Sequence, residues 1–213
     1  MKRVLLIRHG QTEWNILGRW QGALDVPLNA VGEQQAQTVA AYLKDRPITA
    51  VYTSDLARAA NTAAAIAAAR GLTAQPEMRL RELDLGVFQG LTREEIAAQY
   101  PDELAAMQAD YMGFVIPQGE SRQIMQDRAY EAWQSIVPRE AGPEIVMVAH
   151  GGTIRVLLMK LFPERDDARH AEIKNTSIST ITVVENGTME LTELAATPHL
   201  DTIESGRGES ANI

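Results

Sequence analysis

The sequence contains no cysteine, which excludes disulfide bonds, cysteine nucleophiles and thiolate metal sites. Histidine is also scarce: with four imidazoles in the whole chain, a metal site would have to draw mainly on carboxylates. No apolar run approaches the ~18 residues of a membrane-spanning helix, and residues 1–15 lack the apolar core and cleavage site of a signal peptide. These absences predict a cytoplasmic protein with no membrane partner and no bound metal.

Positive charge is in deficit as well, with 20 Lys and Arg against 28 Asp and Glu and a net charge of -8. Proteins that bind the phosphate backbone of nucleic acid need a basic face, so we expect no nucleic-acid partner. The length of 213 residues, 45% of them hydrophobic, suits one α/β domain and is short for two. We therefore predict a single domain over residues 1–213, present as a monomer or a homodimer.

Short apolar runs alternate with helical patterns along the chain, which predicts an α/β fold with a mostly parallel sheet. Strands are expected at residues 4–7, 48–52, 78–83, 144–149, 177–185 and 189–194, the last two joined by the Asn186-Gly187 turn. Helices are expected at residues 30–44 after Asn29, 56–69 with a cap from within 53–55, 92–100 with a Thr92 capping box, 122–136 after Ser121, and 153–161.

Three segments fall outside this alternation. Residues 11–27 form a long loop over the strand ends, and such loops in compact domains are usually functional. Residues 92–140 are expected to make a helical excursion over the same place, and residues 197–213 a flexible tail. His170 and His199 are expected at the surface or in local hydrogen bonds, and Asn175 in backbone hydrogen bonds before the last hairpin.

Two apolar strands that are far apart in the sequence both end in His-Gly, at Arg8-His9-Gly10 and at His150-Gly151. Because the carboxyl ends of parallel strands meet at one edge of a sheet, the two imidazoles can lie over one pocket. Arg58, in the first turn of an alanine-rich helix, can join Arg8 there. Guanidinium groups bind phosphate oxygens bidentately, and a helix amino end adds exposed amides. The pattern predicts a pocket for a dianion.

The same residues suggest chemistry on that dianion. Flanking cations disfavour the charged form of His9, and a neutral imidazole can attack phosphorus to give a phosphohistidine. The departing alcohol then needs a proton, for which Glu82 at the end of the third expected strand is our candidate. A hydrogen-bonded core histidine and a surface glutamate are the alternative interpretations of these two residues.

Several motifs occur in a consistent order: Leu-Ile-Arg-His-Gly-Gln-Thr-Glu-Trp-Asn at 6–15, Gln21-Gly22, Ser54-Asp55-Leu56-Ala57-Arg58-Ala59, Leu80-Arg81-Glu82-Leu83-Asp84-Leu85-Gly86, Gly119-Glu120-Ser121, and Val148-Ala149-His150-Gly151-Gly152. Together they resemble the histidine phosphatase superfamily, also called phosphoglycerate mutase-like, over most of residues 3–185. The resemblance implies a three-layer α/β/α fold and a phosphohistidine mechanism without metal or cofactor.

The resemblance also implies roles for individual residues. His9 is the expected nucleophile, and Glu82 is the expected proton donor. Arg8, Arg58 and His150 are expected to form the phosphate pocket. Further positions that match the family at or beside the phosphate site are Asn15, Gln21, Gly22 and Gly151.

The family contains phosphatases and mutases, and the middle segment favours a phosphatase. Mutases of the family resemble one another in a longer, more basic insertion, whereas here the basic residues are scattered, at Arg93, Arg122, Arg128 and Arg139. We expect hydrolysis of a small phosphate ester, by an enzyme of the broad-specificity branch. A 2,3-bisphosphoglycerate-dependent phosphoglycerate mutase and a catalytically silent phosphate-binding protein remain the alternatives.

The middle segment also bears on the leaving group. Its larger apolar residues are expected to pack mainly as helical core. If one or two face the pocket, the leaving group would be small and partly apolar. These residues are Tyr100, Met107, Tyr111, Met112 and Phe114.

Overall fold

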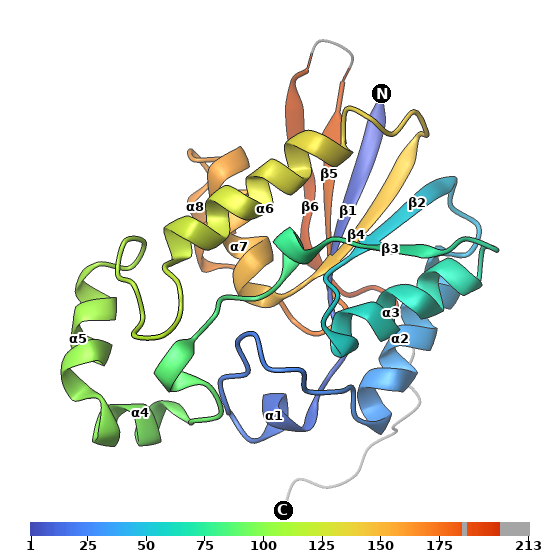
Figure 1. Ribbon diagram of the computed structural model, residues 1–213. Coiled ribbons are helices and arrows are strands. Elements are labelled where there is room, and N and C mark those ends of the chain that lie inside the picture. The colour runs from blue at the N-terminus through green and yellow to red at the C-terminus, as the bar shows by residue number, and fades with distance from the viewer. Residues whose placement is uncertain (185–186, 201–213) are drawn as a thin grey trace, which may run out of the picture.

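The computed structural model describes residues 1–184 and 187–200, which form a central sheet between two layers of helices (Figure 1). The sheet contains β1 (Lys2–Arg8), β2 (Ile48–Thr53), β3 (Ala74–Pro76), β4 (Glu144–Ala149), β5 (Ile178–Val183) and β6 (Met189–Ala196). The strand order is β3-β2-β4-β1-β5-β6, in which β1 to β4 run parallel while β5 and β6 are antiparallel to their neighbours. The predicted mixed, mostly parallel sheet is confirmed.

The register of the two central strands places the two histidines together. Arg8 of β1 lies opposite Ala149 of β4, so His9 and His150 follow directly at the same edge of the sheet. Both strands are apolar on both faces because helices cover each side, as expected for buried parallel strands. The register of the sheet therefore brings the two histidines together at its carboxyl edge, where the sequence predicted the site.

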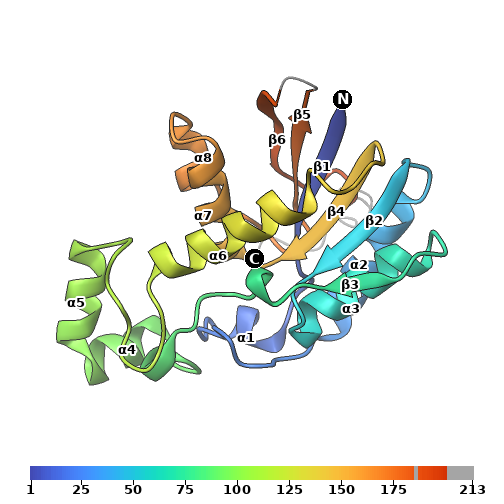
Figure 2. The same ribbon diagram turned by 45° about the horizontal axis from the view of Figure 1, so that its top comes forward.

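Each face of the sheet packs on its own set of helices (Figure 2). On one face, α2 (Ala30–Leu43) and α3 (Ala57–Ala68) cover the alternate strand residues such as Ile7 and Val148. On the other face, α6 (Arg122–Ile136), α7 (Gly151–Leu161) and α8 (Asp166–His170) cover the remaining set, including Leu6 and Met147. This arrangement confirms the three-layer α/β/α fold.

The helical excursion is shorter than residues 92–140. Only α4 (Arg93–Gln99) and α5 (Pro101–Ala109) stand beside the carboxyl edge, where they pack with the loop residues Phe88 and Ile116 in a small core of their own (Figures 1 and 2). Thr92 makes the predicted capping box for α4, and Pro101 begins α5. In contrast, α6 buries Ala129, Trp133 and Ile136 against the sheet, so it belongs to the covering layer.

The strand expected at residues 78–83 is wrong. The ladder ends at β3, and Glu77 then accepts a hydrogen bond from the Arg79 amide and begins the 3-10 helix η1 (Met78–Leu80). Met78 is 60% exposed while Leu80 is buried. Residues two apart in a strand lie on the same face and would be buried alike, so this segment does not have the burial pattern of a half-buried strand. Glu82 is consequently carried by an irregular loop rather than by a strand end.

The predicted cap of α3 is also wrong. The helix begins at Ala57, and its first amide donates to Asp25 of the loop that follows β1, at 2.7 Å. The Ser54 hydroxyl accepts from the Leu56 amide, one residue before the helix, and from no amide within α3. A cap supplied across the fold in this way has no local sequence signal.

Other local features also differ from the prediction. The loop at 11–27 contains the short helix α1 (Glu13–Ile16), and α7 begins at Gly151 instead of Thr153. His199 is 3% exposed and bonds Thr176, so residues 197–200 are packed rather than frayed. The Asn186 part of the predicted turn and residues 201–213 lie outside the described residues.

Among the helices that the structure describes, none has the length and apolar composition needed to cross a bilayer.

Candidate active site

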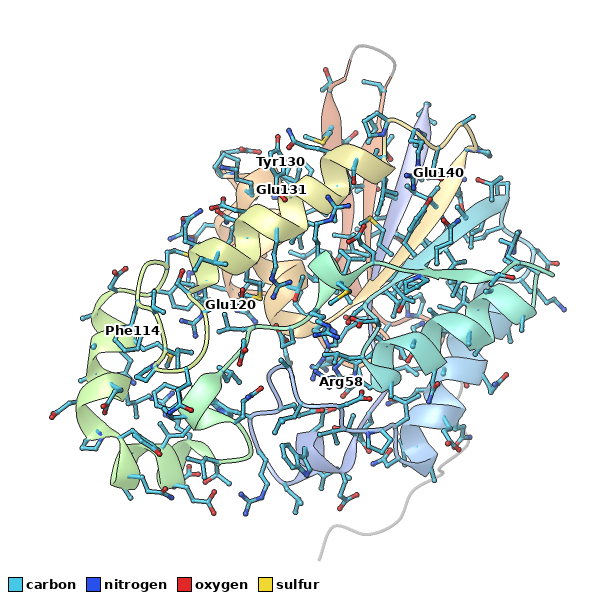
Figure 3. The ribbon with its side chains drawn as sticks, in the orientation of Figure 1. Arg58, Phe114, Glu120, Tyr130, Glu131 and Glu140 are labelled. Atoms are coloured by element: carbon cyan, nitrogen blue, oxygen red, sulfur yellow. The ribbon has the colours of Figure 1, made fainter. Side chains whose placement is uncertain are left out.

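A cavity of about 480 Å³ opens at the carboxyl edge of the sheet. All but one of the residues that the sequence predicted for the site line this cavity. The exception is His150, which is fully buried. Figure 3 shows Arg58 reaching this edge from the amino end of α3, below the ends of β2 and β4. Predicted residues from separate parts of the chain therefore meet in one place: Arg8, His9, Asn15, Gln21, Gly22, Arg58, Glu82 and Gly151.

His9 is held as one tautomer. Its ring is 3% exposed, and Nδ1 lies 2.6 Å from the carbonyl oxygen of Gly10. A carbonyl can only accept, so Nδ1 carries the proton and Nε2 keeps a lone pair. Burial lowers the pKa of His9 well below its usual value, and the neighbouring guanidinium groups of Arg8 and Arg58 lower it further. The lowered pKa favours the predicted neutral imidazole, with desolvation as the larger cause.

His150 is held as the other tautomer. The Nε group of Arg58 donates to its Nδ1 at 3.2 Å, and its Nε2 lies 2.8 Å from the Ser54 hydroxyl. Because the guanidinium can only donate, the ring proton is on Nε2 and points to Ser54. Burial and then Arg58 lower the pKa of His150 well below its usual value. His150 thus acts on the cavity through Arg58, and Ser54, in the Ser54-Asp55-Leu56 motif, fixes its orientation.

The two tautomers give a spectroscopic prediction. In nitrogen-15 NMR of histidine-labelled protein at pH 6, we expect His9 and His150 to remain neutral, since protonation would require a charge in a buried, cationic site. His9 should show its proton on Nδ1, and His150 on Nε2. Assignment of each ring is made from its His→Gln variant. An imidazolium spectrum for His9 at pH 6 would contradict the assigned nucleophile.

The two phosphate-site arginines are fixed by backbone oxygens. Arg58, 1% exposed, donates to the carbonyls of Gly22 and Leu24 at 2.8 and 2.7 Å. Burial is the main cause that lowers its pKa to about 10, so it stays charged at neutral pH. Arg8 donates to the carbonyl of Ile173 at 2.7 Å, and its buried Nε has no hydrogen-bond partner in the structure. Such a buried donor is favourable only when a ligand oxygen satisfies it.

Asn15 has its amide oriented toward the cavity. Its Oδ1 accepts from the Thr12 amide at 3.0 Å and from Asn175 at 3.2 Å, which leaves its NH2 group free of these contacts. Asn175 also donates to the His9 carbonyl at 3.0 Å, as expected for a residue that bonds backbone. Gln21 has a buried Oε1 without a partner in the structure. The Asn15 NH2 group can therefore donate to a small anion, whereas the Gln21 oxygen can only accept from a donor group of a ligand.

Glu82 lies against the first turn of α7. Its Oε2 accepts from the Gly152 amide at 3.0 Å, and its Oε1 accepts from the Leu83 amide at 3.0 Å and the Thr153 hydroxyl at 3.3 Å. A backbone amide in the first turn of a helix has no acceptor within the helix, and the Glu82 carboxyl group supplies that acceptor. This contact also explains why α7 can begin at Gly151 without a capping side chain.

The loop that carries Glu82 is clamped by Arg128 from α6. Arg128 donates to the carbonyls of Arg79, Arg81 and Glu82 at 2.6 to 3.0 Å. It also forms an ion pair with Glu120, 2.6 Å between Nη2 and Oε1, and Figure 3 places Glu120 at the start of α6. Glu82 is thus positioned despite the absence of a strand beneath it. No role was predicted for Arg128, one of the scattered basic residues of the middle segment.

The outer part of the cavity holds three arginines that the sequence did not assign to the site, Arg19, Arg122 and Arg155. Arg155 lies four residues after Gly151 on α7, a spacing that puts both on one helix face. That spacing was available in the sequence. Of the five larger residues considered in the middle segment, Tyr111 lines the cavity, while Tyr100, Met107 and Phe114 pack in the small core of the excursion.

Comparison with known proteins agrees with this architecture. The sequence matches the histidine phosphatase superfamily (branch 1) over residues 4–196. It is 38% identical to phosphoglycerate mutase-like protein 4 of Arabidopsis thaliana, over 96% of this chain and 91% of that one. Mycobacterial glucosyl-3-phosphoglycerate phosphatase has a similar structure, with a TM-score of 0.83 and 31% identity over 92% of this chain and 100% of that one. For alpha-ribazole phosphatase from Shigella flexneri the TM-score is 0.83 and the identity 25%, over 91% and 96%. The chain belongs to the histidine phosphatase superfamily.

Proposed function

We propose that the protein is a metal-independent phosphomonoesterase that hydrolyses small phosphorylated metabolites through a phosphohistidine on His9. The observation that carries the proposal is the fixed tautomer of His9: with Nδ1 bonded to the Gly10 carbonyl, the basic Nε2 belongs to a ring that lines a cavity with two buried arginines. A neutral nucleophile beside cations fits attack on a phosphate dianion.

In the first step, Nε2 of His9 attacks phosphorus, the N–P bond forms and the P–O bond to the alcohol breaks. Arg8 and Arg58 offset the charge on the equatorial oxygens, and His150 keeps Arg58 in place through the 3.2 Å contact at Nε. The leaving alcohol takes a proton from the Glu82 carboxyl group, which lines the cavity beside Gly152.

In the second step, water attacks the phosphohistidine. Glu82, now a carboxylate, takes a proton from that water, the N–P bond breaks, and inorganic phosphate leaves with His9 neutral again. The same group thus serves as acid and then as base. The site residues hold and move each proton without a metal or an organic cofactor, and this absence is part of the proposal.

The mutase alternative uses the same first step and differs in what the phosphohistidine meets next. The name of the plant relative favours it, while the names of the two structural neighbours favour hydrolysis. No residue of α4 or α5 lines the cavity, and Tyr111 is the one residue between Thr92 and Ser121 that does, so the middle segment leaves the cavity open to water. We infer hydrolysis from this short cover.

The test is phosphate release from a panel of phosphomonoesters in EDTA, run beside a mutase assay with 3-phosphoglycerate and 2,3-bisphosphoglycerate. We expect release from several esters, with mutase turnover at least about 100-fold slower than the best hydrolysis. Efficient mutase turnover with little net release would overturn the proposal. A chelator-sensitive activity would overturn its metal-independent part.

A further inference from the structure

The peptide group between Gly10 and Gln11 fixes the tautomer of His9. Its carbonyl oxygen accepts the proton on Nδ1, at 2.6 Å. The amide at the other end of the same peptide group donates to Oε1 of Gln35 in α2, at 2.9 Å. Because a peptide group is planar, an acceptor that holds its N–H also sets the direction of its carbonyl. Gln35 therefore acts on His9 through one rigid unit, although it does not line the cavity.

Such a hold on the carbonyl is needed because residue 10 is a glycine. A Cβ at this position would lie 2.5 Å from the carbonyl oxygen of Gly32 in the first turn of α2, so the close approach of helix and loop excludes a side chain. Glycine, however, restricts its own backbone dihedral angles less than any other residue does. Without an acceptor for the Gln11 amide, the peptide group after Gly10 can rotate and turn its carbonyl away from His9.

Different side chains hold the preceding peptide group, between His9 and Gly10. Its amide donates to the buried Thr62 hydroxyl of α3 at 3.0 Å, and its carbonyl accepts from Asn175 at 3.0 Å. These contacts fix the chain up to the Cα of Gly10 but not the peptide group that follows. On that side of Gly10, the side chain that accepts from the next amide is Gln35. A backbone N–H can only donate, so Gln35 must present its oxygen there.

We propose that Gln35 is a positioning residue for the nucleophile: it keeps the Gly10 carbonyl on Nδ1 of His9 and so keeps the lone pair on Nε2. The proposal rests on the phosphohistidine function and deepens it, since it assigns what keeps the attacking nitrogen unprotonated. In a serine-protease triad, a carboxylate holds the imidazole in its reactive tautomer. Here a backbone carbonyl has that place, and the hydrogen bond to Gln35 orients and polarises its peptide group. Loss of that bond lets the proton move to Nε2, which then has no lone pair for phosphorus.

The experiment compares Gln35→Met, which removes the acceptor, with Gln35→Glu, which keeps one. Methionine is unbranched like glutamine and is a good helix former, so α2 should be preserved. The matched control is Gln34→Met, one position earlier on α2 and exposed. For each variant we measure the nitrogen-15 NMR spectrum of labelled histidine at neutral pH, kcat/KM for p-nitrophenyl phosphate, the inhibition constant of inorganic phosphate, and the Tm.

In Gln35→Met we expect part of His9 to carry its proton on Nε2, and kcat/KM to fall about 10-fold or more, since the orienting carbonyl is still present but no longer held. The inhibition constant of phosphate should change less than about twofold, because Arg8 and Arg58 keep their own backbone contacts. Gln35→Glu should retain the Nδ1 tautomer and most of kcat/KM, and Gln34→Met should match the wild type in every measurement.

Three results would overturn the positioning role. The first is a wild-type tautomer and kcat/KM in Gln35→Met, even with a lowered Tm. The second is a Gln35→Glu variant that loses both as fully as Gln35→Met does. The third is a loss of kcat/KM with the Nδ1 tautomer unchanged, since that effect would not pass through the Gly10 carbonyl. If Gln35→Met does not fold, Gln35→Leu takes its place. If the wild type hydrolyses no ester, the phosphohistidine function fails instead, and the tautomer in the variants still tests the role of Gln35.

Discussion

His9→Ala is expected to abolish hydrolysis of every phosphate monoester, with a loss of at least about 10⁴-fold in kcat, because no other described imidazole lines the cavity. His150 cannot replace it, since both of its ring nitrogens are engaged by Arg58 and Ser54. The measurement is steady-state phosphate release, together with capture of the phosphoenzyme by a detergent quench at alkaline pH; the phosphoenzyme should be stable in base, lost in acid and absent from the variant.

The fold should survive this substitution. His9 contributes one side-chain hydrogen bond, to the carbonyl of its neighbour Gly10, and its ring is not part of the apolar clusters on either face of the sheet. The matched control is His170→Ala. The His170 side chain is 71% exposed on α8 and does not line the cavity. Hydrolysis retained in His9→Ala with a native circular dichroism spectrum would remove His9 from the nucleophile position.

The parts of this site that the sequence predicted are those set by the sheet. Val4 to Ile7 and Ile145 to Ala149 are apolar on both faces, so their place as central parallel strands and the meeting of His9 and His150 follow from periodicity alone. Arg58 could be placed because its helix follows a strand directly. The prediction of these residues depends on short-range sequence signals and on one topological rule, that the carboxyl ends of parallel strands meet at one edge of the sheet.

The parts that could not be predicted depend on contacts between segments with no shared pattern. Glu82 is held by Arg128 from a helix more than forty positions away, and α3 is capped by Asp25 from another loop. Arg122 reaches the cavity only because α6 packs on the sheet rather than joining the excursion. Residue propensity and spacing carry no information on such packing. The family resemblance identified Glu82 as the proton donor, but not Arg128, which holds its loop.

Glu82→Gln is the second large effect, and it should depend on the leaving group. Glutamine keeps one oxygen, which can accept from either the Gly152 or the Leu83 amide, and Arg128 still holds the Glu82 carbonyl, but the amide group has no proton to give an alkoxide. We expect a loss of about 10²- to 10⁴-fold for an alkyl phosphate such as glycerol 3-phosphate. For p-nitrophenyl phosphate, whose leaving group needs no proton, the loss should stay below about 10-fold.

Gly152→Ala tests the same role without touching the carboxyl group. A Cβ at this position would lie 2.5 Å from Oε1 of Glu82, so the carboxyl group must move, while the helical backbone of α7 accepts alanine readily. The loss should again be larger for the alkyl ester, though smaller than in Glu82→Gln. In Gly151→Ala the new Cβ meets Arg8 at an ordinary 3.6 Å, so any loss should fall equally on both esters. Equal losses on the two esters in both Glu82→Gln and Gly152→Ala would mean that Glu82 binds or supports the phosphate site and that the proton comes from elsewhere, with water the remaining donor.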